Sequence, residues 1–269
     1  MDGERPLDPS RAAAAEAFLE SLAELGLDRL PRAVHQPAEA PESTESEVAE
    51  PGPRLEQLNA RIEACRLCAL GETRRCSVPG EGSARARVMF VGEAPGAQED
   101  ASGRPFVGPA GQLLTKIIEN GMGLSREEVF IANVLKCRPP QNRDPQTEEK
   151  KLCTPFLQEQ MEIIAPELVI ALGKHAANHL LGRESSLGRL RGRLHQPAQG
   201  GPPVLATYHP AYLLRNPADK RACWQDIQMG MDHLGLKRPS RASGGQTGTP
   251  TPAPPSQENG RPQEGKHRW

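Results

Sequence analysis

Long apolar runs and aromatic side chains are scarce in this sequence. Phe, Trp and Tyr make up only 3% of its 269 residues, and apolar runs such as ELVIAL are far too short to cross a bilayer. The opening MDGERPLDPSR has no basic stretch followed by an apolar one, so we expect no signal peptide. We therefore expect a cytoplasmic protein without a membrane anchor, whose six cysteines are free thiols or metal ligands rather than disulfides.

The net charge of −1 conceals two regions of opposite sign. Residues 1–53 contain 12 acidic and 4 basic side chains, a net charge of −8, which leaves +7 on residues 54–269. A basic body is typical of a domain that binds a polyanion, although an excess of this size is only moderate.

The two ends of the chain differ from its middle in composition. Residues 31–53 form a Pro/Glu/Ser linker, and before it a short helix at 10–27 either folds back on the domain or docks a partner. The end of the chain is rich in Pro and Gly and has too few apolar side chains to fold. We predict an acidic N-terminal arm at 1–53, a folded domain at 54–237 and a disordered tail at 238–269, with possible protein partners for the arm or the tail.

Short apolar runs alternate with helical periodicity in the middle of the chain. Four runs predict buried strands: 88–92, 129–135, 168–173 and 203–208. The stretches with helical periodicity are 111–121, 147–164, 174–182 and 217–234. This alternation predicts a three-layer α/β/α fold with a central, mainly parallel four-stranded sheet.

Polar loops rich in Gly and Pro follow three of the four predicted strands. They span 92–108, 133–140 and 208–217. In parallel sheets, ligands collect at the carboxyl ends of the strands. The three loops therefore predict one site at that edge of the sheet.

Four cysteines form a C-x2-C pair followed by a more widely spaced pair: Cys65, Cys68, Cys137 and Cys153. Zinc and an iron–sulfur cluster both accept four thiolates, and the spacing alone does not separate them. His175 and His179 lie four residues apart, which is better explained by a polar helix face than by a metal site. Cys76 could compete as a ligand, and Cys223 is most simply a buried thiol.

The motifs GEAPGAQED, GRPFVGPAGQLL, NVLKCRPPQNRDP and YHPAYLLRNP, together with the four cysteines, resemble the family 4 uracil-DNA glycosylases. The resemblance covers about residues 54–234. It implies an enzyme of base excision repair that flips deoxyuridine out of DNA, hydrolyses its N-glycosidic bond and leaves an abasic site. It also implies that a [4Fe–4S] cluster with a structural role is bound by Cys65, Cys68, Cys137 and Cys153.

The resemblance implies a role for each residue of the pocket. His209 matches the catalytic histidine that donates to uracil O2, and Asn133 matches the amide that reads the uracil edge. Phe106 matches the ring that stacks on the flipped base. The backbone amides of Gly92, Glu93 and Ala94 complete the pocket, and Glu99 crowds the C5 side of the base.

Two further features concern DNA and water. The segment after the histidine, Leu213, Leu214 and Arg215, is expected to supply an apolar wedge and a positive charge at the duplex gap. A related branch of the superfamily has an Asp that orients the water where this chain has Ala94, so we assign water activation to Glu93. The stretch 138–149 has no His, which favours hydrolysis over a covalent adduct.

Two alternatives stay open beside this interpretation. One is a non-catalytic iron–sulfur protein that binds nucleic acid through the same fold, and the other is a zinc-bound version. The expected partner is uracil-containing DNA, single- or double-stranded, and we expect the protein to act as a monomer.

Overall fold

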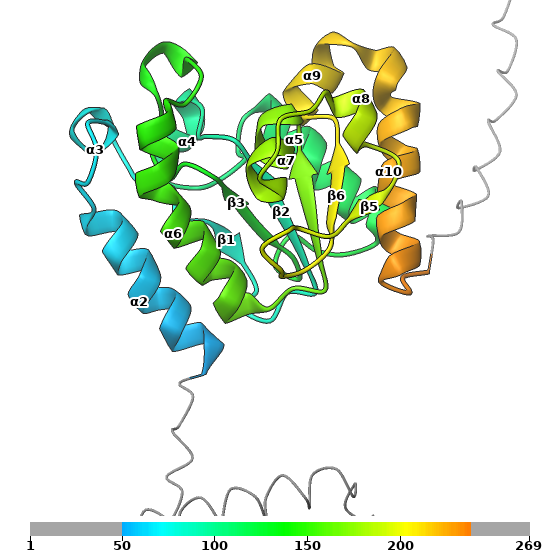
Figure 1. Ribbon diagram of the computed structural model, residues 1–269, viewed down its shortest axis with the longest axis horizontal. Coiled ribbons are helices and arrows are strands. Elements are labelled where there is room, and N and C mark those ends of the chain that lie inside the picture. Colours follow the sequence, from blue (N-terminus) through cyan, green and yellow to red (C-terminus); the bar gives the residue numbers. More distant parts are fainter. Residues whose placement is uncertain (1–49, 238–269) are drawn as a thin grey trace, which may run out of the picture. The chain divides into compact units, whose positions relative to one another are not determined.

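Figure 1 shows the computed structural model, which describes residues 50–237. The predicted helix at 10–27, the linker as far as residue 49 and the tail lie outside the described residues. The first described helix, α2 (Pro51–Ala64), has a proline at its first position, where the missing N–H costs no hydrogen bond. The predicted domain boundary at 53/54 therefore falls within the first turn of this helix. None of the described helices is both long and apolar enough to span a membrane.

The four predicted strands form the parallel centre of the sheet. They are β2 (Val88–Gly92), β3 (Phe130–Asn133), β4 (Leu168–Leu172) and β6 (Val204–Thr207). In space they follow the order β3-β2-β4-β6, and every neighbouring pair is parallel. Two short strands, β1 (Glu81–Gly82) and β5 (Leu194–His195), pair antiparallel at the edges. The three-layer fold is confirmed, but the sheet is mixed and has six strands rather than four.

The remaining elements are helices, and the predicted helical stretches are found where expected. The α-helices after α2 are α3 (Leu70–Thr73), α4 (Ala97–Ser102), α5 (Pro109–Lys116), α6 (Thr147–Ile164), α7 (Lys174–Leu181), α8 (Leu187–Leu190), α9 (Pro210–Arg215) and α10 (Lys220–His233). The stretch predicted at 111–121 is α5 continued by a π-helical turn, η1 (Ile117–Met122). Two short 3₁₀ turns, η2 (Pro140–Asn142) and η3 (Pro217–Asp219), complete the set.

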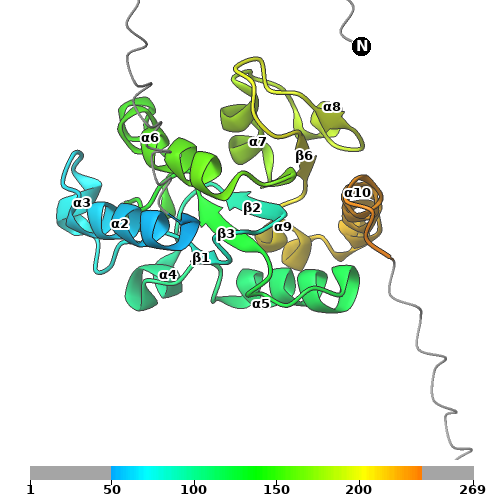
Figure 2. The same cartoon turned by 90° about the horizontal axis from the view of Figure 1, so that it is seen from below.

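The central strands are buried because helices cover both faces of the sheet (Figure 2). Alternate residues of a strand point to opposite faces. In β2, Met89 and Val91 pack with residues of α2, α6 and α7, whereas Val88 and Phe90 pack with α5, α9 and α10. Strands covered on both sides need apolar residues at every position, which explains their uninterrupted apolar runs.

The register of the parallel strands aligns their carboxyl ends. Gly92 is the last residue of β2 and pairs with Asn133, the last residue of β3. Beside them, the backbone N–H of Gly173 after β4 donates to the carbonyl of Thr207, the last residue of β6. His209 follows two residues later. The three polar loops predicted to form a site therefore leave the same edge of the sheet.

Candidate active site and thiol cluster

A glycine at the end of β2 lets an amide and an aromatic ring come together. A Cβ added to Gly92 would lie 2.6 Å from Cζ of Phe106 and closer still to Oδ1 of Asn133. Real Cβ atoms essentially never show such short separations. Asn133 and Phe106 therefore approach bare backbone at Gly92, and any side chain there would displace one of them.

This arrangement predicts the effect of Gly92→Ala. The added methyl would push the Asn133 amide and the Phe106 ring apart, which weakens the binding of a base between them. We expect KM for the DNA substrate to rise about tenfold, with a smaller change in kcat. The measurement is steady-state kinetics beside Gly188→Ala, a helical position in α8 where an added Cβ would meet nothing within 4 Å. Equal kinetics for Gly92→Ala and wild type would show that the pocket lies elsewhere.

Asn133 presents an unused hydrogen-bond acceptor. Its side chain is 1% exposed, and its Oδ1 is buried without a hydrogen-bond partner among the described residues. A buried polar atom without a partner costs about 1–3 kcal/mol. A ligand that donates a hydrogen bond to Oδ1 would recover that cost, so Asn133 is built to bind a donor.

Phe106 is held in an unusual backbone conformation. Its φ is 51°, in the left-handed region that bulky residues rarely adopt. Such a conformation costs of order 1–3 kcal/mol and persists only where neighbours enforce it. Arg126 donates to the carbonyls of Pro105 and Phe106, and Gly111 leaves room for the Phe106 carbonyl, which a Cβ there would overlap. The ring lies 5.7 Å from that of His209, centroid to centroid, at 34°.

Glu99 fastens the loop that carries Phe106. One carboxylate oxygen accepts hydrogen bonds from the backbone N–H groups of Val107 (3.0 Å) and Gly108 (3.1 Å). The other accepts from the N–H of Gly96 at 3.1 Å. Glu99 thus ties the loop after β2 to the start of α5, and this contact is part of what keeps Phe106 in place.

His209 is a neutral donor with a defined tautomer. It precedes α9, and its Nδ1 accepts a hydrogen bond from the backbone N–H of Ala211 at 3.1 Å. In a neutral imidazole whose Nδ1 accepts, the hydrogen is on Nε2. Burial lowers the pKa of His209 to about 4; nearby Arg215 lowers it further and Glu99 opposes the shift. At neutral pH the ring therefore offers an uncharged N–H.

Glu93 lies with His209 on a cleft of about 360 Å³, which Tyr208 and Tyr212 also line. Burial raises the pKa of the Glu93 carboxyl, and the nearby His175, whose Nδ1 is 3.6 Å from Oε1, opposes the rise. The ligand atoms of Glu93, Asp144 and His175 lie within 4.8 Å of one another, but Asp144 and His175 are exposed. Glu93 thus places a half-buried carboxylate on the same cleft as His209.

Ala94 and the predicted DNA-binding segment after His209 lie partly where the sequence predicted them and partly elsewhere. The methyl of Ala94 packs against Leu135 and Cys137, on the thiol side of the loop. Leu213 is 1% exposed and belongs to the core, so its prediction as part of the wedge is wrong. Leu214 is 44% exposed and Arg215 is exposed, so both can reach DNA.

The four predicted ligand cysteines line one cavity. Cys65 ends α2, Cys68 precedes α3, Cys137 follows β3 and Cys153 lies in α6. The rest of the lining is mainly apolar, with side chains such as Ile62, Leu152 and Phe156 and no carboxylate. Cys76 and Cys223 do not line it, so Cys76 is not a competing ligand in this structure.

Basic groups surround the sulfur atoms. The Arg74 guanidinium donates to Cys137 Sγ at 3.0 Å, and the backbone N–H of Lys136 donates to Cys153 Sγ at 3.3 Å. Burial raises the pKa of the Cys137 thiol, and raises that of Cys153 to about 11, which Lys136 opposes. Four sulfur donors, two of which accept hydrogen bonds from N–H groups, fit an anionic metal–thiolate centre, including an iron–sulfur cluster.

Two functional candidates were not anticipated from the sequence. Lys136 is 1% exposed, and burial lowers its pKa to about 8, while Cys153 opposes the shift. Its position offered a signal, because a lysine beside a cysteine at the end of a buried strand is unusual. Arg126 had no such signal, since its contact with Phe106 arises from the tertiary fold.

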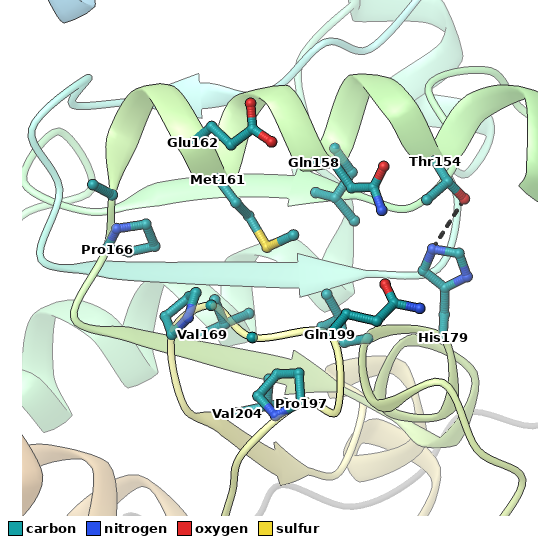
Figure 3. Close-up of a pocket in the computed structure, with 16 residues that line it drawn as sticks. Thr154, Gln158, Met161, Glu162, Pro166, Val169, His179, Pro197, Gln199 and Val204 are labelled. Atoms are coloured by element: carbon teal, nitrogen blue, oxygen red, sulfur yellow. Dashed lines mark hydrogen bonds between the residues drawn. The ribbon is translucent and has the colours of Figure 1, made fainter. Parts of the chain in front are cut away.

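A larger cavity of about 750 Å³ lies away from these residues, between α6, α7 and the loop before β6 (Figure 3). His179 and Thr154 hydrogen-bond across it at 3.1 Å. Val169 and Val204 mark the amino ends of β4 and β6, opposite the edge that carries Asn133 and His209. Asn133, Phe106, His209 and the four cysteines do not line this cavity, and we assign it no chemistry.

The chain is similar to proteins of known activity. A family model described as the uracil DNA glycosylase superfamily matches residues 79–228. The type-4 uracil-DNA glycosylase of Saccharolobus solfataricus is 42% identical over 189 residues, which is 68% of this chain and 88% of the relative. The type-4 uracil-DNA glycosylase of Pyrobaculum aerophilum is 46% identical over 181 residues, which is 65% of this chain and 92% of the relative. A type-5 uracil-DNA glycosylase from Thermus thermophilus is 32% identical over 183 residues, and the match covers 55% of this chain and 83% of the relative.

Proposed function

The chain belongs to the uracil-DNA glycosylase superfamily, with type-4 enzymes among its relatives, and from this we propose how its own residues remove uracil from DNA. It is a uracil-DNA glycosylase, a hydrolase of base excision repair that acts on DNA containing uracil. The reaction breaks the N1–C1′ bond, adds water at C1′ and leaves an abasic site. The base must first leave the stack to reach a pocket.

Asn133 reads the flipped base. Uracil offers a donor at N3–H and an acceptor at O4, side by side, and a carboxamide offers the matching acceptor and donor. Asn133 Oδ1, buried without a partner among the described residues, accepts from N3–H, and its Nδ2 donates to O4. Cytosine presents an acceptor at N3 and a donor at N4, so it leaves both groups of a fixed Asn133 unpaired. Phe106 stacks on the face of the base.

His209 stabilises the leaving group. As the N1–C1′ bond lengthens, negative charge spreads onto N1, O2 and O4 of uracil, and the sugar becomes cationic. The Nε2–H of His209 donates to O2 as that charge builds. The ring needs no protonation because the hydrogen bond from Ala211 already places the hydrogen on Nε2. Water takes the place of the base at C1′, and uracil leaves as an anion that is protonated in solution.

Glu93 orients the attacking water in this proposal. The carboxylate must be ionised to accept a hydrogen bond from water, and burial raises its pKa. Activity therefore falls as pH drops through that raised pKa. His209, with a pKa of about 4, contributes no ionisation near pH 6.5.

A pH profile tests this assignment. We expect the single-turnover rate of wild type to fall on the acid side and that of Glu93→Gln to be lower but nearly independent of pH. The measurement is uracil release under single-turnover conditions from pH 5 to 9, with Glu127→Gln, a surface carboxylate, as control. The same acid limb in Glu93→Gln would assign the ionisation, and with it the water, to another group.

Glu99 fixes the loop that carries Phe106, and this loop excludes a methyl group at C5 of the base. Its two oxygens hold three backbone amides, so the carboxylate and the ring move as one unit. The extra methyl of thymine would need space that this loop fills.

Leu214 and Arg215 bind DNA at the gap left by the flipped nucleotide. We expect Leu214→Ala to lower kcat/KM on double-stranded DNA about tenfold, because the wedge offsets an unstacking cost of a few kcal/mol. Single-stranded DNA needs little unstacking, so its kcat/KM is expected to change about twofold or less. Leu194, an exposed leucine on the edge strand β5, provides the control substitution. An equal loss on both substrates would contradict the wedge.

Cys65, Cys68, Cys137 and Cys153 hold a [4Fe–4S] cluster in this proposal. The bound cluster supplies a crosslink between α2, the end of β3 and α6, segments far apart in the sequence. Its place beside the β2 and β3 loops makes its role the support of the DNA-facing edge. The four sulfur donors and the absence of carboxylates from the cavity support this cofactor.

The rest of the chain completes the proposal. The catalytic domain spans 54–237 and works as a monomer in the cytoplasm, where thiols stay reduced. The matched parts of the type-4 relatives span 82–96% of their own length but 65–69% of this chain. The acidic arm and the tail recruit protein partners.

The observation that carries the proposal is the contact of Gly92, Asn133, Phe106 and His209 at one sheet edge. Incubation with a deoxyuridine oligonucleotide followed by alkali tests it against a non-catalytic nucleic-acid-binding protein. Strand cleavage at the uracil position supports the enzyme. Tight binding without cleavage supports the alternative.

A further inference from the structure

Lys136 connects the thiol cavity to the residue that reads uracil. Its backbone N–H donates to Cys153 Sγ at 3.3 Å. Its Nζ donates to the backbone carbonyl of Asn133 at 2.8 Å. Among the described residues, Lys136 is thus the one that hydrogen-bonds both a proposed ligand cysteine and Asn133.

The ammonium group is fixed in a buried position. Nζ also donates to Gln160 Oε1 at 2.6 Å, and Gln160 Nε2 donates to the carbonyl of Pro79 at 2.8 Å. The carbonyl of Lys136 accepts from the N–H of Val78 at 2.8 Å. Gln160 is fully buried and Lys136 is 1% exposed, so these bonds are not exchanged with water.

One residue joins the sulfur site to Asn133. The Lys136 backbone N–H donates to Cys153 Sγ, and the Nζ of the same residue donates to the Asn133 carbonyl. A displacement of Cys153 therefore moves the Lys136 backbone and, with it, the donor that holds Asn133.

The held carbonyl determines where the Asn133 side chain points. Asn133 ends β3, and the next two residues are fixed by hydrogen bonds from Val134 N–H to Gly92 and from Leu135 N–H to Glu93. Without Lys136, the Asn133 carbonyl would be a buried acceptor that lacks its donor. Of the two hydrogen bonds that hold this peptide, only that from Val134 N–H to Gly92 would remain, so we expect the carboxamide to shift from its place against Gly92 and Phe106.

We propose that Lys136 is a positioning residue that aligns Asn133 for uracil and links that alignment to occupancy of the thiol cavity. The inference rests on the proposed role of Asn133 as the uracil reader. It makes uracil recognition, rather than only folding, depend on the thiol-bound centre. It also explains why a lysine is buried at the end of an apolar strand.

Lys136→Met tests the proposal, with Arg74→Met as matched control. Both remove a basic side chain beside the thiol cavity. The Lys136 side chain donates to Asn133 and leaves the backbone bond to Cys153 in place, whereas the Arg74 side chain donates to Cys137 Sγ and, among the described residues, has no hydrogen bond to β3. The readouts are iron and acid-labile sulfide per chain, and the Kd of free uracil, measured by its inhibition of the reaction and normalised to iron content. We expect Lys136→Met to weaken uracil binding about tenfold per iron-loaded chain and Arg74→Met to leave it unchanged.

The separate effects on KM and kcat distinguish a residue that positions Asn133 from one that only stabilises the fold. We expect KM to rise more than kcat falls in Lys136→Met, because misaligned Asn133 weakens binding of the base in ground and transition states alike. Loss of uracil affinity only in proportion to iron, or equally in both variants, would overturn the proposal. A wild-type protein that releases no uracil would instead defeat the proposed function.

Gln160→Met keeps the proposal testable if Lys136→Met does not fold. Gln160 contacts the ammonium but no cysteine, so the variant loosens Nζ while leaving the sulfur contacts in place. We expect full iron content and a threefold to tenfold weaker affinity for uracil, about 0.7–1.4 kcal/mol. Wild-type uracil affinity at full iron content would overturn the role of Nζ.

Discussion

His209→Ala is expected to lower the single-turnover rate of uracil release by about 10²- to 10³-fold, while uracil-containing DNA binds nearly as tightly as to wild type. A donor aimed at charge that develops in a closed pocket is worth about 3–4 kcal/mol. The hydrogen bond strengthens mainly in the transition state, so its loss reduces the chemical step more than binding. Pro210 fixes the backbone after the ring and Ala211 sets its tautomer, so the donor is oriented before the base arrives.

The competing role for His209 is that of a loop brace. If the ring only braced the start of α9, then DNA binding, iron content and thermal stability would decline together with the rate. His179→Ala is a suitable control, because His179 is also largely buried but lines the cavity at the opposite edge. A His209→Ala protein with a near wild-type single-turnover rate would contradict both the role and the charge-stabilising mechanism.

Cys137→Ser is expected to lose iron, acid-labile sulfide and thermal stability together. Cys137 is the proposed ligand that follows β3, four residues from Asn133, and the proposed cluster would join α2, the end of β3 and α6 there. A serine hydroxyl is a poor replacement for a thiolate ligand, and metal binding of this kind contributes directly to folding. We therefore expect the largest fall in thermal stability among the variants described.

Cys76→Ser is the control for that substitution. Its sulfur contacts the carbonyl of Ala101 at 3.9 Å and lies outside the thiol cavity. We expect full iron content and near wild-type stability. Purified wild-type protein that contains zinc and no iron would contradict the cofactor assignment. Loss of iron from Cys76→Ser would contradict the choice of the four ligand cysteines.

The sequence was most informative about the centre of the fold. Uninterrupted apolar runs predicted the four parallel strands, because strands covered on both faces need apolar residues throughout. The edge strands β1 and β5 were missed because each has two residues, too few for any periodicity. They form by pairing with β3 and β6, which is a tertiary effect. The π-helical turn after α5 likewise left no local signal.

The candidate site shows the same division between motif and tertiary context. Asn133, Phe106 and His209 were identified from short motifs, and the structure brings their side chains together at one edge of the sheet. The burial of Leu213 was not anticipated, because a leucine after a turn is equally consistent with a wedge and with a core residue. The contacts of Lys136 join residues from three separate segments, so no pattern within one segment predicts them.

Base release from three matched DNA strands tests the central claim most directly. The strands carry uracil, hypoxanthine or thymine at one position, and the free base is quantified by mass spectrometry after incubation with iron-loaded protein. We expect release of uracil, little hypoxanthine and no thymine, because Asn133 and His209 match the uracil edge and the Phe106 loop excludes the thymine methyl. Release of no base, or of all three bases at similar rates, would contradict the account.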